Sequence, residues 1–119
     1  MKLTKDWIVG FIEGEGSFYS QKQKHYKDKE YVYPRFSISQ KDKEILEKVR
    51  DFLEMGHITK HKSSYQGKNL KNPQNKKYDS CYKLQVQNKK DCKKLANMLE
   101  GNIRSKARKE DFEWWKELF

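Results

Sequence analysis

The chain has 119 residues, a length that suits a single domain over residues 1–119 with one hydrophobic core. Lys and Arg number 27 against 17 Asp and Glu, so the net charge is +10. That charge indicates a polyanionic partner, with nucleic acid first and an acidic membrane surface second. No apolar run approaches the roughly 20 residues that cross a bilayer, so a membrane protein is not expected.

The two cysteines, Cys81 and Cys92, are too few for a disulfide framework and lack the spacing of zinc ligands. We expect both to be reduced, as is typical of intracellular proteins. The N-terminus does not resemble a signal peptide. The expected location is therefore an organelle (chloroplast or mitochondrion) or a prokaryotic or phage cytoplasm, and not the secreted space.

Hydrophobic periodicity and turn residues predict the order α-β-β-α-β-β-α-α, an α+β fold. The expected elements are a helix capped by Thr4, strands at 17–25 and 31–40, a helix from Asp42 that Gly56 ends, strands at 57–62 and 80–86 separated by a polar loop at 63–79, a helix at 91–100, and a last helix from about Lys109.

Alternation within the strands assigns two faces to the expected sheet. The side chains expected to face the core are Val32, Phe36, Ile38, Tyr82, Leu84 and Val86. Those expected to face outward are Tyr31, Tyr33, Arg35, Ser37, Ser39, Cys81, Lys83 and Gln85.

The first predicted helix departs from an ordinary helix in two ways. Gly10 and Gly14 lie one turn apart on one face, and each costs about 1 kcal/mol relative to Ala in a helix interior. Glu13 and Glu15 bring acid to the helix end where the macrodipole disfavours it. Close approach of another backbone would explain the glycines, so we expect a helix–helix interface that ends in a metal site.

Residues 8–16 read Ile-Val-Gly-Phe-Ile-Glu-Gly-Glu-Gly, which resembles the nine-letter LAGLIDADG motif of homing endonucleases without a gap. The Ser-Phe that usually follows in that family stands at 17–18. The resemblance implies the family's αββαββα fold with a saddle-shaped antiparallel sheet that binds DNA, and a catalytic Mg²⁺ or Mn²⁺. Because the chain holds one copy of the motif, a second chain would supply the partner helix of a homodimer.

The resemblance also implies roles for the residues of the motif. Glu15 matches the acid that holds the catalytic metal, and the carbonyl group of Gly14 matches a second ligand. Glu13 matches an acid that caps or braces the partner helix. Together with Trp7, Gly10 and Gly14, it would lie at the dimer interface.

Two residues outside the motif match the family's catalytic pattern. Gln40 ends a segment that resembles Phe-x-aliphatic-(Ser/Thr)-Gln-Lys, in which the Gln orders water at the metal. Lys106 resembles the Lys of a late turn, which steadies charge near the scissile phosphate. One departure is Glu44, which stands where family members often carry an Arg, and either Lys41 or Lys43 could substitute.

The excess positive charge lies in the two predicted hairpins. Residues 21–41 hold six basic and two acidic side chains, and residues 57–90 hold nine and one. Outward polar side chains on a twisted β-ribbon can read bases in the major groove. The candidate DNA-binding residues are Ser17, Tyr19, Gln21, Gln23, Tyr33, Arg35, Ser37, Ser39, His57, Thr59, His61, Lys83, Gln85 and Arg104.

The resemblance therefore implies a homodimeric, metal-dependent DNA endonuclease that cuts both strands of a long, roughly palindromic target; members of this family are usually encoded in an intron or intein. One alternative is a maturase that binds an intron RNA through the same basic surface. Another is a sequence-specific DNA-binding protein with an inactive site. A half of a longer two-motif enzyme is a further alternative, which the start at Met1 and the complete set of elements disfavour.

Overall fold

A computed structural model describes residues 2–24, 29–62 and 80–119. The predicted loop at 63–79 and His25 lie outside this range. The elements in chain order are α1 (Lys5–Glu15), β1 (Gly16–Lys24), β2 (Glu30–Gln40), α2 (Lys43–Leu53), β3 (His57–Lys62), β4 (Ser80–Val86), α3 (Lys89–Leu99) and α4 (Lys106–Lys116). The predicted element order and the α+β class are confirmed.

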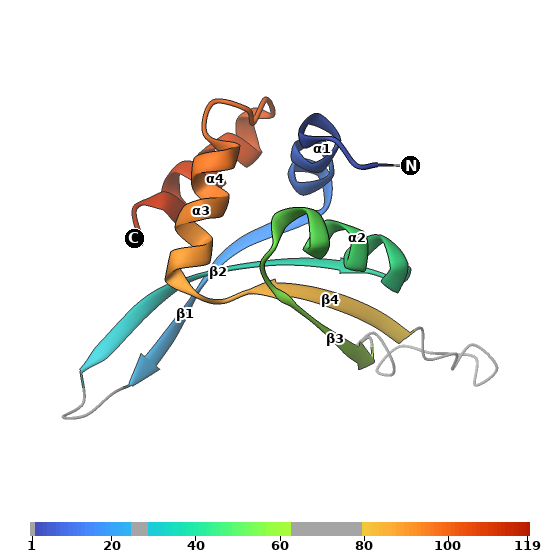
Figure 1. Ribbon diagram of the computed structural model, residues 1–119. Helices are drawn as coiled ribbons and strands as arrows, with labels where there is room; N and C mark the ends of the chain where they lie inside the picture. The colour runs from blue at the N-terminus through green and yellow to red at the C-terminus, as the bar shows by residue number, and fades with distance from the viewer. Residues whose placement is uncertain (1, 25–28, 63–79) are drawn as a thin grey trace, which may run out of the picture.

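The strands form one antiparallel sheet in the order β1-β2-β4-β3. Figure 1 shows this sheet as an arch, with the helices above its convex side and the concave side open. The register pairs Gly16 of β1 with Ile38 of β2, and Leu84 of β4 with both Ile38 and Ile58 of β3. These four residues lie on the helix-covered face, which is where the core forms.

The core fills the space between the helices and the convex side of the sheet. Its largest fully buried side chain is Trp115 of α4, whose ring centroid lies 4.9 Å from that of Phe18 in β1. Phe112, one turn earlier, lies 5.5 Å from the same Phe18 ring. These aromatic contacts pack α4 against β1, beside the end of α1.

The helix ends differ from the sequence expectations because capping residues outweigh apolar periodicity. α2 ends before Glu54, which takes a left-handed conformation with φ of 56°, two residues before the expected stop at Gly56. α3 begins after the N-cap Asn88 and α4 after the N-cap Ser105. None of the helices in the described ranges is long and apolar enough to cross a bilayer.

The register keeps the alternation expected for β2, but burial along this strand does not follow it. Arg35 and Ser37, on the face expected to point outward, are only 8% and 4% exposed. β2 is a central strand with neighbours on both sides, so side chains on its open face are covered by those of β1 and β4. Val32, expected in the core, is 42% exposed, because the β1–β2 ribbon extends beyond the helix layer there (Figure 1).

Candidate functional site

The motif helix α1 buries one side and leaves the other open. The Thr4 hydroxyl caps it by accepting a hydrogen bond from the Trp7 N–H at 3.2 Å. Ile8 and Ile12 are fully buried in the core. On the opposite side, Trp7 is 41% exposed and stacks on Phe11 with ring centroids 4.9 Å apart.

The glycines of the motif fall into two groups. No atom of the described residues would lie within 4 Å of a Cβ added to Gly10 or Gly14, apart from their own helix backbone and chain neighbours. A Cβ on Gly16 would lie 2.6 Å from the Ile12 carbonyl oxygen and 2.7 Å from the Phe36 ring. The chain's own packing therefore requires glycine at position 16 and at neither of the other two.

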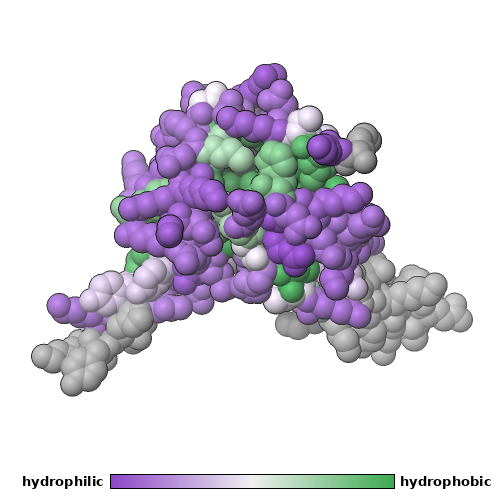
Figure 2. Space-filling view, in the orientation of Figure 1, coloured by the Kyte–Doolittle hydropathy of each residue, from purple (hydrophilic) through white to green (hydrophobic). Residues whose placement is uncertain are grey.

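The open side of α1 is an apolar surface with a polar border. Figure 2 shows hydrophobic residues gathered over α1, surrounded by hydrophilic ones. Beside this surface lies a hollow of 360 Å³, lined by Asp6, Val9, Gly10, Glu13, Asn102 and Arg104. An exposed apolar helix face of this kind marks a site where another protein surface can pack.

Glu13 joins the end of α1 to the start of α4. Its carboxylate oxygen Oε1 accepts hydrogen bonds from the backbone N–H groups of Arg104 and Ser105, the latter at 3.4 Å. Ser105 is the N-cap of α4, so Glu13 places negative charge where the dipole of that helix favours it. The brace that the structure contains is thus within one chain. The expected contact with a partner helix stays a prediction.

The expected metal ligands lie at the exposed C-terminal end of α1. Gly14 and Glu15 are both exposed, and within the described part of the chain the Glu15 carboxylate has no hydrogen-bond or ion-pair partner. Carboxylate and carbonyl oxygens are the ligands that Mg²⁺ prefers, so these residues fit the metal. No group of three or more His, Cys, Asp or Glu side chains in the described ranges could hold an ion.

The register brings Gln40 beside this end of α1. Gly16, the residue after Glu15, pairs with Ile38. Gln40 lies two residues further along β2, about 7 Å from Ile38 at 3.3 Å per residue. Because the two are separated by two residues, their side chains lie on the same face of the strand. Gln40 is half-buried and points to the helix side, unlike the DNA-binding candidates.

Lys106 lies at the start of α4 and not in a turn as expected. It is exposed and directly follows Ser105, which Glu13 contacts. Glu44, the departure from the family pattern, forms an ion pair with Lys48 at 3.5 Å. Lys43, one of the two possible substitutes, lies 5.8 Å from the ring centroid of Tyr82, the residue that pairs with Gln40.

The sequence reasoning missed Arg108 in the first turn of α4. Its Nη1 donates to the carbonyl oxygen of Gly16 at 2.8 Å, and its Nη2 donates to that of Gly14 at 3.4 Å. A basic residue in a first helical turn is disfavoured by the helix dipole, which is a signal that it serves another purpose. The signal becomes readable only once Ser105 is recognised as the N-cap.

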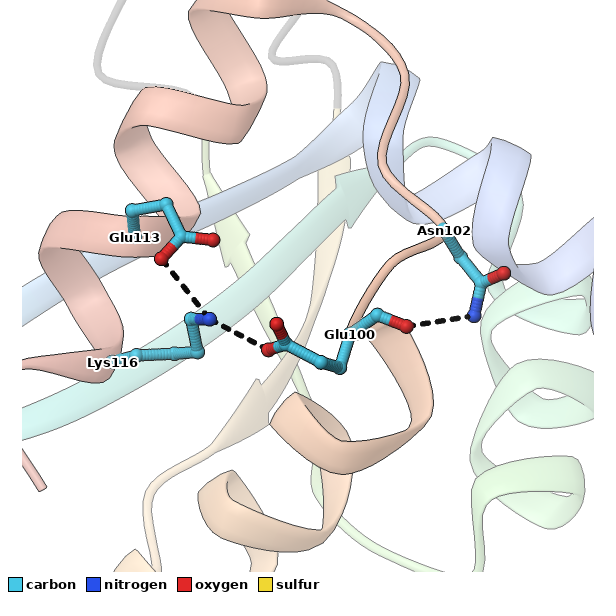
Figure 3. A network of polar contacts seen from close by, with 4 residues as sticks. All are labelled: Glu100, Asn102, Glu113 and Lys116. Atoms are coloured by element: carbon cyan, nitrogen blue, oxygen red, sulfur yellow. Dashed lines mark hydrogen bonds and ion pairs between the residues drawn. The ribbon is translucent and has the colours of Figure 1, made fainter.

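The end of α3 and the end of α4 are joined by a small polar network (Figure 3). Lys116 Nζ lies 2.6 Å from a carboxylate oxygen of Glu100 and 3.1 Å from one of Glu113. The hydrogen bond with Glu100 raises the pKa of Lys116. Asn102 Nδ2 donates to the backbone oxygen of Glu100 at 3.3 Å. The network fixes the α3–α4 loop, and Lys106 and Arg108 lie in the helical turn that follows this loop.

The candidate DNA-binding residues of the strands share the concave face of the sheet. One row across all four strands consists of Ser17, Ser37, Gln85 and His57. A second row consists of Ser39, Lys83 and Thr59. On the β1–β2 ribbon the paired positions are Tyr19 with Arg35, Gln21 with Tyr33, and Gln23 with Tyr31.

Three of the candidate DNA-binding residues do not present a described, freely exposed side chain on the concave face. Arg35 donates to Gln21 Oε1 at 3.0 Å and to the Gln87 carbonyl oxygen at 2.7 Å, so its guanidinium group is already engaged. Arg104 is in the α3–α4 loop beside α1, and the structure does not bring it to the sheet. His61 lies on β3, but its side chain is outside the described part.

Both cysteines are free thiols in the structure. Cys92, in the first turn of α3, is fully buried, with its Sγ 3.6 Å from the Val86 carbonyl oxygen. Burial raises the pKa of this thiol to about 11, with a smaller opposing effect from the charge of Arg35. A protonated thiol in that position acts as a small packing residue, as the sequence predicted.

An arched antiparallel sheet with an open polar face, under a motif helix that runs into its first strand, is the homing-endonuclease fold of the LAGLIDADG class. The sequence profile described as LAGLIDADG endonuclease matches residues 8–119. The chain therefore belongs to this family, and the resemblance seen in the nine-residue motif is confirmed.

Similar proteins are known as a sequence and as solved structures. Probable intron-encoded endonuclease 4 of Neurospora crassa is 31% identical over 115 residues, which are 97% of this chain and 17% of the relative. The homing endonuclease I-TnaI gives a TM-score of 0.76 at 27% identity, covering 98% of this chain and 71% of that chain. The archaeal intron-encoded homing endonuclease I-Vdi141I, in complex with DNA, gives 0.67 at 28% identity, covering 95% and 64%.

Proposed function

We propose that the chain is a site-specific, divalent-metal-dependent DNA endonuclease that cleaves both strands of a long pseudo-palindromic target as a homodimer. The observation that carries this proposal is the exposed Glu15 carboxylate, without a partner among the described residues, at the end of a helix whose glycine face is open. A negatively charged side chain at a helix C-terminus is electrostatically unfavourable, so a bound cation would relieve the repulsion.

The concave face of the sheet supports double-stranded DNA as the substrate. Its rows of polar side chains, such as Lys83, Gln85 and Thr59, can donate and accept hydrogen bonds at base edges. The excess positive charge lies within residues 21–41 and 57–90, which include these strands and their connecting loops, and it would contact phosphates. A solved relative, I-Vdi141I, is a homing endonuclease in complex with DNA, which agrees with this assignment.

The open face of α1 supports the homodimer. Gly10 and Gly14 expose backbone on that face although the chain's own packing does not need glycine there. Trp7 and Phe11 add apolar surface next to them. A second copy of the same helix is the natural occupant, because a two-fold axis places identical patches against each other. It would also bring a second Glu15 to the site.

The residues near Glu15 support phosphodiester hydrolysis. A bound divalent metal would supply Lewis acidity and charge neutralisation at the scissile phosphate. Glu15 and the Gly14 carbonyl group would hold it. Gln40, beside the end of α1, can orient a water molecule through its amide. Lys106, at the exposed start of α4, can stabilise negative charge that develops on the phosphate.

The experiment is a selection of cleaved duplexes from a randomised DNA library with Mg²⁺. We expect a target of two similar half-sites, as the two-fold symmetry of the protein requires. Glu15→Gln should bind the selected duplex with unchanged affinity and fail to cut it. Selection of no duplex under any divalent metal would contradict the proposal.

One observation favours RNA binding as a second candidate function. Lys89, Lys90, Lys93 and Lys94 line one exposed side of α3, in the helix layer and away from the concave face. This second basic surface could contact the backbone of a folded intron RNA. Tight binding of intron RNA that is lost on changing these lysines to Gln, without DNA cleavage, would favour a maturase over the endonuclease.

A further inference from the structure

Arg108 holds the backbone on both sides of Glu15. Its two Nη atoms donate to the carbonyl oxygens of Gly14 and Gly16, at 3.4 and 2.8 Å. A guanidinium group is planar and carries donors in a fixed fork, so a single side chain can orient two acceptors at once. Lys, with one flexible ammonium group, cannot reproduce that geometry.

The contact is one half of a reciprocal connection between α1 and α4. α1 has no basic residue in its own last turn, and α4 has no acidic residue in its own first turn. Arg108 supplies the cation to the end of α1, and Glu13 supplies the anion to the start of α4. Each charge therefore lies where the dipole of the other helix favours it.

Lys106 is the first residue of α4 and lies in the same helical turn as Arg108. Any shift of α4 relative to α1 would thus move Lys106 relative to Glu15. We propose that Arg108 is a positioning residue for cleavage, which fixes the Gly14–Gly16 backbone and sets the place of Lys106 opposite Glu15. The inference rests on the proposed function, since it assumes that Glu15 holds the metal and Lys106 faces the phosphate.

Arg108 has a second effect, of opposite sign, on metal binding. Its positive charge lies beside the oxygens that would hold a divalent cation, and like charges repel. Arg108 therefore weakens metal binding while it improves the geometry for cleavage. A residue with a merely structural role would not have this effect, because its loss would weaken metal binding and slow cleavage together.

Three variants separate the charge from the geometry. Arg108→Met removes both, Arg108→Lys keeps the charge but not the fork, and Lys109→Met removes a neighbouring exposed charge of α4 as the matched control. The measurements are the Mn²⁺ dissociation constant, followed by electron paramagnetic resonance of free Mn²⁺, and the single-turnover cleavage rate at saturating duplex.

We expect Arg108→Met to bind Mn²⁺ at least about threefold more tightly, from the lost repulsion, and to cleave roughly 100-fold more slowly, as misplacements of about 1 Å do. Arg108→Lys should keep the Mn²⁺ affinity within about twofold and still cleave roughly 10-fold more slowly. Lys109→Met should match the wild type in both measurements.

A cleavage rate unchanged in both Arg108 variants at equal DNA affinity would overturn the inference, as would unchanged or weaker Mn²⁺ binding by Arg108→Met. If Arg108→Met does not fold, Arg108→Lys decides by its rate alone. A wild-type protein that cleaves no duplex would contradict the proposed function instead. In that case the Mn²⁺ affinity of Arg108→Met still decides the inference, and an unchanged or weaker affinity overturns it.

Discussion

Gly16 lies so close to the aromatic ring of Phe36 that a Cβ atom at position 16 would be 2.7 Å from it. This contact lets α1 turn directly into β1 above the core. It also shows that the glycines of the motif are required for different reasons. Gly16 serves the fold of one chain, whereas Gly10 and Gly14 face open space.

Gly10→Ala and Gly14→Ala should therefore spare the monomer and damage the dimer. Replacing glycine by alanine within a helix stabilises it by up to about 1 kcal/mol, so the monomer should unfold at an equal or higher urea concentration. The added methyl groups should keep the two motif helices apart. Sedimentation velocity should give a dimer dissociation constant raised by at least about 10-fold, or about 1.4 kcal/mol.

Gly16→Ala is the matched control for this pair, because it changes the same residue type within the same motif. It should lower the stability of the chain itself, by the about 1–3 kcal/mol typical of overpacking. A dimer affinity equal to that of the wild type in Gly10→Ala and Gly14→Ala would show that another surface forms the dimer, and a wild type that stays monomeric would show that none forms.

The bonds from Glu13 to the start of α4 should contribute to stability in the way an N-cap does. Glu13→Ala should lower the free energy of unfolding by about 1–2 kcal/mol. Glu13→Gln should lose less, because its amide oxygen can still accept from the Arg104 and Ser105 N–H groups. Urea unfolding followed by tryptophan fluorescence gives both values.

Glu110→Ala serves as the control for Glu13→Ala, since Glu110 is an exposed acid on α4. Surface substitutions of this kind change stability by less than about 0.5 kcal/mol. Equal losses in Glu13→Ala and Glu110→Ala would mean that the contact between α1 and the start of α4 contributes nothing specific.

The concave face of the sheet should account for the salt dependence of DNA binding. Lys83 lies on that face between Ser39 and Thr59. If its ammonium group contacts a phosphate, Lys83→Gln should reduce the slope of log affinity against log salt concentration by about 1. Lys93→Gln, on the outer side of α3, should leave the slope unchanged. The reverse result would assign DNA to the helix side.

The buried thiol of Cys92 should make the protein less stable at alkaline pH. Burial raises the pKa of this thiol from 9.0 to about 11 in the folded protein. Because the unfolded chain loses this proton at lower pH, the free energy of unfolding should fall as the pH rises from about 9 to about 11. Chemical unfolding at a series of pH values measures the effect.

Cys92→Ala should lack this part of the pH dependence, while Cys81→Ala, at a half-buried position of β4, should keep it. Ala is smaller than Cys, so Cys92→Ala should also lose stability at all pH values. An identical alkaline slope in all three proteins would mean that the Cys92 thiol titrates freely.

Elements with strong local signals could be predicted from the sequence. Alternating polarity and the flanking turn residues define β3 and β4, whose bounds match the prediction. α3 and α4 begin earlier than the sequence predicts, because their first turns are rich in Lys and lack apolar periodicity. The N-caps Asn88 and Ser105 fix those starts instead.

The parts of the site that depend on distant contacts could not be predicted. Glu15 and Gln40 can be recognised from the sequence because each belongs to a local pattern, and the register of β1 and β2 places them together. Arg108 belongs to no such pattern, and its partners Gly14 and Gly16 precede it by more than 90 residues. The burial of Arg35 arises from its central strand, which alternation alone does not reveal.

The central claim is that two chains form one catalytic unit through their motif helices. It is tested most directly by refolding wild-type protein with Glu15→Gln in varied proportions and measuring double-strand cleavage. If each cleavage event needs a Glu15 from both chains, activity should fall as the square of the wild-type fraction. A linear fall, with each wild-type chain cutting by itself, would contradict the account.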